Sequence, residues 1–429
     1  MMNGWKRRKK KKYLKIAIPA GIVLLLAAAG LGAWKTGWLR GEENLEALGA
    51  SVSENQGEDE QEKGTETDGI DKAQDEEEKA LGEEAQNGIR ERKTGNVKVK
   101  GIYVTGPIAG NPAFQDLVDL VDGTELNAMV IDVKNDEGNI TWKMELESAQ
   151  AIGACVPYIA DMEKFMEELQ SHHIYTIARI VCFKDPCLAG GRPELALEKA
   201  DGTPVTDANG MAWVNPYKEE VWEYLTDVAE AAAEAGFDEI QFDYVRFPIG
   251  SDADAADYGV NMEEYTKQQA INGFLDYAVS RLHQKDTVVT ADVFGTIIGS
   301  ETDVERVGQD YAALGKCVDV LSPMVYPSHY DNHVFGLEVP DAMPYETVLA
   351  ALEGSKTELA DIPEQDRAIV RPWLQAFTAT WVKGHISYEG EEIRRQIQAV
   401  YDAGYEEWIL WNAVNRYSEE GLEAEGENF

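Results

Sequence analysis

An acidic side chain ends a strand-like run in the middle of the chain. The run reads Asp-Glu-Ile-Gln-Phe-Asp-Tyr-Val-Arg-Phe-Pro over residues 238–248 and follows a long helical pattern. Apolar Ile240 and Phe242 alternate with polar residues in it. Because side chains alternate along a strand, Gln241 and Asp243 share one face. In a (β/α)8 barrel that face points toward the mouth, where catalytic groups lie, so Asp243 is the leading candidate for chemistry.

Two further strand-like segments carry an aspartate on the same inward face. Asp132 lies in the segment 128–134, and Asp292 lies in the segment 288–294. Clustered carboxyl groups suit the cleavage of a glycosidic bond, which needs one acid to protonate the leaving oxygen and one carboxylate. Closely spaced carboxylates also raise the pKa of one another, which supplies that acid near neutral pH. Each aspartate could instead be the structural ion-pair partner of a nearby lysine or arginine.

The same alternation assigns basic, aromatic and amide side chains to the mouth. They could bind sugar hydroxyls or stack on sugar rings, or they could pack the barrel and its rim. On the last strand the register decides which of two neighbours points inward. These candidate substrate-binding residues are Tyr103, Lys134, Arg179, Gln241, Tyr244, Arg246, Tyr326, His329, Arg371, Trp373, Gln375, Trp411 and Asn412.

Strand and helix patterns alternate from residue 97 onward, which predicts one α/β domain over residues 97–429 with a (β/α)8 TIM-barrel fold. A doubly wound open sheet is the alternative, but the first strand is not followed by its Gly-rich phosphate turn. The expected strands are 99–105, 128–134, 175–183, 239–244, 288–294, 318–326, 369–377 and 407–412. The expected helices are 114–121, 162–172, 218–235, 262–283, 304–314, 345–359 and 391–403.

Other chemistries have weaker signals. His329 and His333 are four residues apart and could hold a metal ion on a helix, but the proline and asparagine around them favour a loop. The sequence has no zincin, Walker A or Gly-x-Ser-x-Gly motif. Cys182 and Cys187 could form a local disulfide, although separate thiols are the simpler interpretation. We therefore expect neither a metal nor another cofactor.

The N-terminal segments predict a membrane anchor. Residues 1–15 are strongly basic, and the next segment, 16–38, opens with nineteen uncharged, mostly apolar residues. As a helix they would span about 28 Å, close to the hydrocarbon core, with Trp34 and Trp38 at the interface. The basic cluster should stay in the cytoplasm, which predicts a single-pass cell-membrane protein with an extracellular catalytic domain. The alanines at 27–29 leave a cleaved signal peptide as the alternative.

Charge separates the remaining regions. Residues 39–96 are dominated by Glu, Asp, Gln, Gly and Lys, which predicts a disordered acidic linker. The whole chain has a net charge of −39, and subtracting the first 89 residues leaves about −35 for residues 90–429. A domain this acidic repels phosphate backbones, so nucleic acid is not an expected partner. No feature of the sequence indicates an oligomeric state.

Several motifs together resemble the DUF4015 family of glycoside-hydrolase-like barrel proteins, over roughly residues 97–420. They are Gly-Ile-Tyr-Val-Thr at 101–105, Val-Ile-Asp-Val-Lys at 130–134, Trp-Val-Asn-Pro at 213–216, the stretch 237–248, Ala-Asp-Val-Phe-Gly at 291–295 and Leu-Ser-Pro-Met-Val-Tyr-Pro at 321–327. The resemblance implies a barrel-type glycosidase, on a bacterial membrane or secreted, whose fourth-strand carboxylate, here Asp243, is a main catalytic group. Where many barrel glycosidases carry a seventh-strand acid, this chain has Gln375, so Asp292 is taken as the second carboxylate.

The sequence therefore predicts a membrane-anchored glycoside hydrolase that acts on a cell-envelope or extracellular polysaccharide. Asp243 would be the nucleophile or transition-state stabiliser, and Asp292 the general acid/base, with Asp132 in reserve. Two alternatives stay open. One is a non-catalytic carbohydrate-binding or envelope-scaffold barrel, and the other is a metal-dependent deacetylase that uses His329 and His333 with an aspartate.

Overall fold

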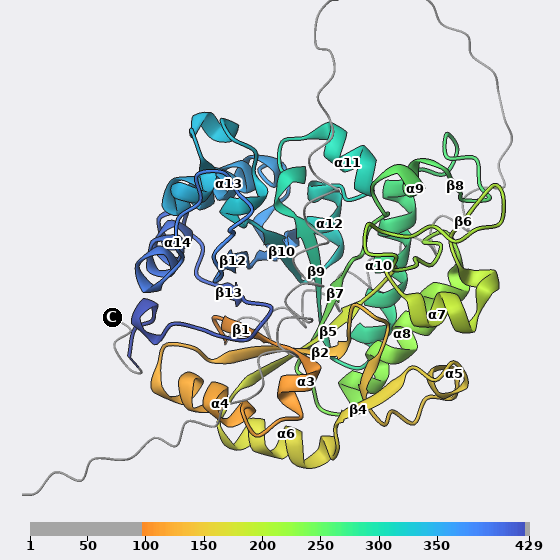
Figure 1. The fold of residues 1–429 in the computed structure, drawn as a ribbon, viewed down its shortest axis with the longest axis horizontal. Helices are drawn as coiled ribbons and strands as arrows, with labels where there is room; N and C mark the ends of the chain where they lie inside the picture. Colours follow the sequence, from red (N-terminus) through yellow and green to blue (C-terminus); the bar gives the residue numbers. More distant parts are fainter. Residues whose placement is uncertain (1–96, 425–429) are drawn as a thin grey trace, which may run out of the picture. The chain divides into compact units, whose positions relative to one another are not determined.

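Eight parallel strands close into a barrel in the computed structural model, which describes residues 97–424. The first strand pairs with the second on one side and with the last on the other, so the ring has no open edge. The expected (β/α)8 fold is confirmed, and the doubly wound alternative is wrong because an open sheet would leave two unpaired edges. The barrel strands, central in Figure 1, are β1 (Lys100–Val104), β2 (Ala128–Lys134), β5 (Tyr175–Val181), β7 (Glu239–Asp243), β9 (Val288–Phe294), β10 (Val320–Met324), β12 (Trp373–Gln375) and β13 (Trp408–Trp411).

Helices follow the strands along the chain and surround them, with α13 and α14 on one side of Figure 1 and α8 and α10 on the other. The longer ones are α4 (Phe114–Gly123), α6 (Met162–Ser171), α8 (Glu219–Glu234), α10 (Lys267–His283), α13 (Pro344–Glu358) and α14 (Gly390–Asp402). The shorter ones are α3 (Gly106–Ala109), α5 (Glu147–Ala151), α7 (Pro186–Gly191), α9 (Ser251–Asp254), α11 (Glu301–Val307) and α12 (Tyr311–Cys317).

Two of the expected helices differ from the structure, and local capping explains both differences. The pattern from 262 starts as a helix only at Lys267, because Thr266 caps it in a reciprocal capping box with Gln269. The pattern over 304–314 is two helices rather than one. Gly308 adopts a left-handed conformation that ends α11, and the side chain of Asp310 then caps α12.

Short strands outside the barrel were not predicted. An antiparallel strand, β3 (Ile140–Trp142), pairs with the end of β2 and carries β4 (Cys155–Ile159) beside it. The long loops after β5 and β7 meet in a two-stranded sheet of β6 (Glu198–Lys199) and β8 (Ala256–Asp257). The expected strand 369–377 forms two separate strands, β11 (Ile369–Val370) beside β10 and then β12. Cys182 and Cys187 do not form a disulfide.

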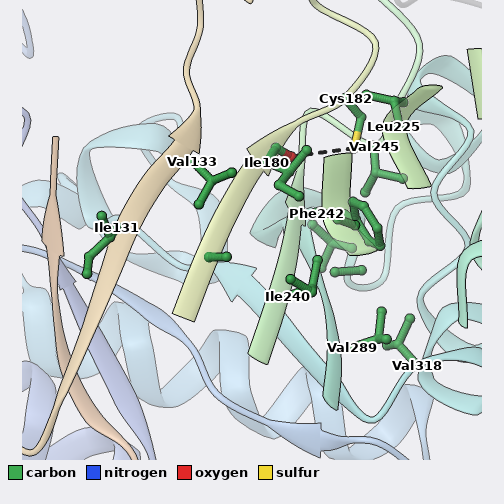
Figure 2. Packing of buried hydrophobic residues seen from close by; sticks show 14 of the residues in the cluster. Ile131, Val133, Ile180, Cys182, Leu225, Ile240, Phe242, Val245, Val289 and Val318 are labelled. Atoms are coloured by element: carbon green, nitrogen blue, oxygen red, sulfur yellow. Dashed lines mark hydrogen bonds between the residues drawn. The ribbon is translucent and has the colours of Figure 1, made fainter. Parts of the chain in front are cut away.

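The buried apolar residues form two layers, as the alternation along the strands requires. The outer layer packs between strands and helices and includes Ile131, Val133, Ile180 and Phe242 (Figure 2). The inner layer fills the barrel. Its members are Val99, Tyr103, Ala128, Val130, Ile177, Tyr326, Trp373 and Ile409. Residues that alternate with the outer layer therefore point into the barrel, where the candidate site lies.

The predicted anchor 16–38 and linker 39–96 lie outside the described residues. Within residues 97–424 no helix combines the length and apolar character needed to cross a bilayer.

Candidate active site

Arg179, on β5, is the centre of the polar cluster inside the barrel. Its Nε and Nη2 lie 2.8 and 2.6 Å from Oδ2 of Asp243, and its Nη1 donates to Oδ1 of Asp132 at 2.7 Å. Nη2 also donates to Oδ2 of Asp136 at 3.2 Å. The guanidinium is fully buried and its fork contacts three carboxylates, so one cation fixes the positions of three acids.

Asp243 ends β7, and its two oxygens have different partners. Oδ2 binds the guanidinium of Arg179, and Oδ1 accepts a hydrogen bond from the backbone N–H of Tyr244 at 2.6 Å. Tyr244 has a φ of +50°, in the left-handed region that a bulky aromatic residue rarely adopts. Such backbone strain is concentrated at functional sites, and here it follows the candidate acid directly. Asp243 remains 7% exposed at the mouth.

Asp292 lies on β9, beside β7 in a parallel register that aligns Phe242 with Ala291. The next residues along, Asp243 and Asp292, therefore lie side by side. Oδ1 of Asp292 accepts hydrogen bonds from two neutral groups, the indole N–H of Trp373 at 2.8 Å and the side-chain amide of Gln241. Burial raises the pKa of Asp292 well above its usual range, and the charge of Asp243 raises it further. Asp292 is thus placed to carry a proton.

Asp132, on β2, has a mixed environment. Its Oδ1 binds Arg179, and its Oδ2 accepts from the hydroxyl of Tyr103 at 2.7 Å. Burial raises the pKa of Asp132 to about 6, although the charge of Arg179 opposes this shift. Tyr103 is itself stacked on Trp411, with ring centroids 4.1 Å apart. Asp132 is therefore tied to the wall of the barrel on both oxygens.

The loops after β2 and β5 add acidic and basic groups that the sequence analysis missed. Asp136 accepts from Nζ of Lys184 at 3.0 Å as well as from Arg179, and about a third of its side chain is exposed. Burial raises the pKa of Asp136, but the charges of Lys184 and Arg179 outweigh it and lower the pKa overall. Lys184 also lies 3.8 Å from Asp207 and 4.6 Å from the ring of Tyr244. Asp136 lies two residues after the expected strand 128–134, and this position at the end of a barrel strand could have marked it as a candidate.

A sequence model of the DUF4015 family, described as "Putative glycosyl hydrolase domain", matches residues 101–417. The chain belongs to this family. The matched range contains all of the barrel except the first residue of β1 and includes the aspartate cluster around Arg179. The DUF4015 resemblance expected from the motifs is confirmed.

Solved structures resemble this DUF4015 domain to different degrees. The glycoside hydrolase domain of PgaB (BpsB) from Bordetella bronchiseptica is 15% identical and superposes with a TM-score of 0.54, covering 74% of this chain and 94% of that one. A hypothetical protein from Ruminiclostridium thermocellum is 37% identical over 45% of this chain and 97% of its own, with a TM-score of 0.41. The spore cortex-lytic enzyme SleL from Bacillus megaterium is 12% identical over 76% of this chain and 73% of its own, with a TM-score of 0.44. No curated protein matches the chain significantly.

Most of the predicted site residues of this DUF4015 domain meet at the mouth, but not all of them can touch a substrate. Gln241 is fully buried beneath Asp292. Trp411 rather than Asn412 points inward, because Trp411 stacks on Tyr103, while the amide of Asn412 binds the carbonyl of Ala376 at 2.6 Å. Gln375 is fully buried and its amide donates to Asp341 at 3.0 Å. These three amide side chains stabilise the scaffold.

Two of the predicted basic residues lie elsewhere. Nζ of Lys134 is 2.8 Å from Oδ2 of Asp185, and both side chains are fully buried. A register shift between Asp132 and Lys134 marks a bulge in β2, which breaks the alternation that had placed Lys134 beside Asp132. Arg371 precedes β12 and binds Glu239, the first residue of β7, at 2.7 Å, so it lies at the amino ends of the strands.

The two histidines have different environments. His329 is half-buried beside Tyr326, with ring centroids 5.0 Å apart, and its Nδ1 lies 3.0 Å from the hydroxyl of Ser328. Burial lowers the pKa of His329 to about 3, so it stays neutral. His333 is exposed. No group of three His, Cys, Asp or Glu side chains within residues 97–424 is arranged to hold a metal ion.

A surface hollow of about 590 Å³ lies among the loops that follow β5 and β7. The loop residues 193–202, the segment 215–218 and residues 257–260 line it. It does not include any of the candidate carboxylates.

Proposed function

We propose that the domain is a glycoside hydrolase in which Asp243 and Asp292 form the catalytic pair. The observation that carries the proposal is the contrast between these two neighbouring carboxyl groups. Asp243 binds a guanidinium, whereas Asp292 is bound only by neutral donors and has a raised pKa. Pairs of acids whose environments differ in this way divide the roles of carboxylate and proton donor.

The proposed reaction follows from these roles. Asp292 donates its proton to the glycosidic oxygen as the bond to the anomeric carbon breaks, and a carboxylate oxygen of Asp243 bonds to that carbon. Asp292, now ionised, then takes a proton from water, whose oxygen displaces Asp243. Neighbouring strands are about 4.8 Å apart, which favours the short carboxyl separation of retaining enzymes over the longer one of inverting enzymes.

Arg179 and Asp132 position the nucleophile in this mechanism. Arg179 bonds to Asp243 through two nitrogens and to Asp132 through a third. The planar guanidinium thereby fixes the direction in which the Asp243 carboxylate faces. Asp132 anchors the other side of Arg179 and is itself held by Tyr103.

The test is a screen of the full-length protein against envelope glycans and extracellular polysaccharides, with product analysis by mass spectrometry. Asp243→Asn and Asp292→Asn should each abolish product release, because one removes the attacking carboxylate and the other the proton donor. The matched control is Asp116→Asn, an exposed aspartate in α4, which should leave activity unchanged. Full activity of Asp243→Asn would refute the assignment.

A second candidate function is glycan binding without turnover. The observation that favours it is the near-complete burial of Asp292, which is 1% exposed. A proton donor must reach the glycosidic oxygen, so a closed site would bind sugar but not cleave it. Binding of a glycan by the wild-type protein with no product over a long incubation would select this alternative.

The proposal includes the cell membrane as the site of action. The basic residues 1–15 and the apolar start of segment 16–38 support a single-pass anchor, with the barrel outside the cell and its substrate a cell-envelope or extracellular polysaccharide. Protease treatment of intact cells should then remove the barrel from the membrane fraction. Recovery of the whole chain in the cytosol would contradict this part of the proposal.

A further inference from the structure

Arg246 is a buried cation that lacks an acidic partner at short range. It follows β7, is 8% exposed, and its Nη1 donates to the carbonyl of Phe247 at 2.8 Å. Its guanidinium carbon lies 4.5, 5.0 and 5.1 Å from the ring centroids of Phe294, Trp213 and Tyr244. No carboxylate of residues 97–424 forms a salt bridge with it within 4.0 Å.

The other buried guanidiniums of the barrel are arranged differently. Arg179 contacts three aspartates, and Arg371 contacts two glutamates. Burying a cation without an anion is unfavourable, so buried charges in proteins are normally paired. Burial lowers the pKa of Arg246, although Tyr244 and the more distant carboxylates of Asp243 and Asp207 oppose this shift. Within residues 97–424, Arg246 therefore has no carboxylate within 4.0 Å, whereas Arg179 and Arg371 each have at least two.

Aromatic rings compensate only part of the cost. Cation–π contacts attract the charge to the faces of the rings, but they do not supply acceptors for hydrogen bonds from the N–H groups in the plane of the guanidinium. Beside it, the indole nitrogen of Trp213 is also buried and has no hydrogen-bond acceptor within the described part of the chain. Arg246 and Trp213 thus place hydrogen-bond donors side by side in this part of the site.

The missing group is best supplied by a ligand. A carboxylate carries a full negative charge and two oxygens in one plane, and it matches the fork of a guanidinium. Arg246 is three residues beyond Asp243, and Phe294 is two residues beyond Asp292, so a group bound here would lie next to the proposed catalytic pair. A sugar bound at the cleavage site could place its own carboxylate on Arg246.

We propose that Arg246 is the recognition subsite for the carboxylate of an acidic sugar in the substrate. This inference rests on the proposed glycoside hydrolase function and specifies its substrate class. Two kinds of sugar supply the required chemistry, a uronic acid with a ring carboxylate and an amino sugar with a lactyl-ether carboxylate. Because residues 90–429 carry a net charge of about −35, long-range electrostatics oppose an acidic polymer. Recognition must then come from the short-range pair with Arg246.

The experiment compares glycans that differ in a carboxylate. Binding is measured by calorimetry on the full-length chain in neutral detergent, carrying Asp243→Asn so that bound glycan is not turned over. One pair of probes is tetragalacturonate and its carboxyl-reduced form. The other is the peptide-free tetrasaccharide of peptidoglycan, with alternating lactyl-ether sugars, and chitotetraose, which lacks the lactyl group.

At least one acidic probe should bind roughly tenfold or more tightly than its neutral counterpart. Adding Arg246→Met should remove this difference, and the matched control Arg306→Met, which alters an exposed guanidinium in α11, should retain it. The pair that shows the preference identifies the source of the carboxylate. The preference should also persist in 0.5 M salt, where long-range electrostatics are screened.

The inference is overturned if neither acidic probe is preferred, if Arg246→Met keeps the preference, or if salt abolishes it. Should Arg246→Met fail to fold, Arg246→Lys, which keeps the charge but loses the fork, should weaken the preference. An unchanged preference in that variant also overturns the inference. Failure of the hydrolase proposal would give a different result. The carboxylate preference would persist, but the protein with Asp243 restored would release no product.

Discussion

The two ends of the barrel use the same residue types for different purposes. At the amino ends of the strands Arg371 binds Glu239 at 2.7 Å and Glu407 at 2.8 Å, and all three side chains are almost fully buried. At the carboxyl ends Arg179 binds three aspartates, of which Asp136 is about one-third exposed. The buried cluster around Arg371 at the amino ends is therefore structural, whereas the cluster around Arg179 at the carboxyl ends is the candidate reaction centre. The two differ in their access to solvent.

Strand β7 contributes an acid to both ends. Glu239 is its first residue and Asp243 its last, so the two carboxylates are about 13 Å apart along the strand. Two substitutions on this one strand can therefore test whether the ends are separate in function.

The largest expected effect is on activity. Asp243→Asn should lower kcat on a responsive glycan by roughly a thousandfold or more, because a residue that acts on the reacting bond is lost. Arg179 keeps Asp132 and Asp136 as partners, so the melting temperature should change by only a few degrees. Steady-state kinetics and calorimetry on the same preparation check both statements. A large loss of stability with little loss of kcat would contradict the separation of the two ends.

Glu239→Gln should do the reverse. Arg371 would lose one of its two carboxylates in a site closed to water, and breaking a buried ion pair costs about 3–5 kcal/mol. We expect this loss in the free energy of unfolding by urea, with kcat of the folded fraction unchanged. A selective loss of kcat would show that the ion pairs at the amino ends of the strands take part in catalysis.

The protonation of Asp292 gives a pH-dependent prediction. Its pKa is raised in the folded state, so as pH rises from the ordinary carboxyl range toward the folded-state pKa, the native state loses stability relative to the unfolded state. Asp292→Asn keeps an oxygen acceptor for Trp373 and Gln241 but cannot ionise. The variant should therefore be more stable than the wild type at pH 7, and this advantage should disappear near pH 4. Urea unfolding at the two pH values measures it, and a variant less stable at pH 7 would contradict a protonated Asp292.

The smallest expected effects come from a matched pair of hydroxyl deletions. Tyr103→Phe removes a hydrogen bond to Asp132 at the mouth, and Tyr175→Phe removes one to Glu239 at the amino ends of the strands. Each should cost about 0.5–1.5 kcal/mol of stability. Tyr103→Phe should also raise the pKa of Asp132 above about 6, because the lost bond stabilises the carboxylate. The pH–activity profile should therefore move to higher pH for Tyr103→Phe and stay in place for Tyr175→Phe.

Much of the fold could be predicted because the alternation of apolar residues is a local property. All eight barrel strands fall within or close to their expected ranges, and the inward faces of β5, β7 and β9 were predicted correctly. The pattern did not reveal that Gly308 divides one expected helix into two, because a left-handed glycine interrupts a helix without interrupting its apolar period.

The position of a side chain along the barrel axis was harder to predict than whether it points into the barrel or out of it. Alternation places Arg371 inside the barrel but does not say that it lies among the amino ends of the strands, where Glu239 and Glu407 bind it. The bulge in β2 turned Lys134 toward Asp185, and nothing in the local sequence marks that bulge. Asp136 was missed because it lies in a loop, where no periodic pattern assigns a direction.

The sequence by itself determined the strands, their inward faces and the three aspartates that point into the barrel, because these follow from local periodicity and side-chain chemistry. Only the tertiary structure decided which acid meets which base. Arg179 rather than Arg246 binds Asp243, and Asp292 meets only neutral donors, because barrel closure sets the neighbours of each strand and the height of each residue within it. Those neighbours decide which carboxyl group holds a proton, and they leave Arg246 in need of an anion.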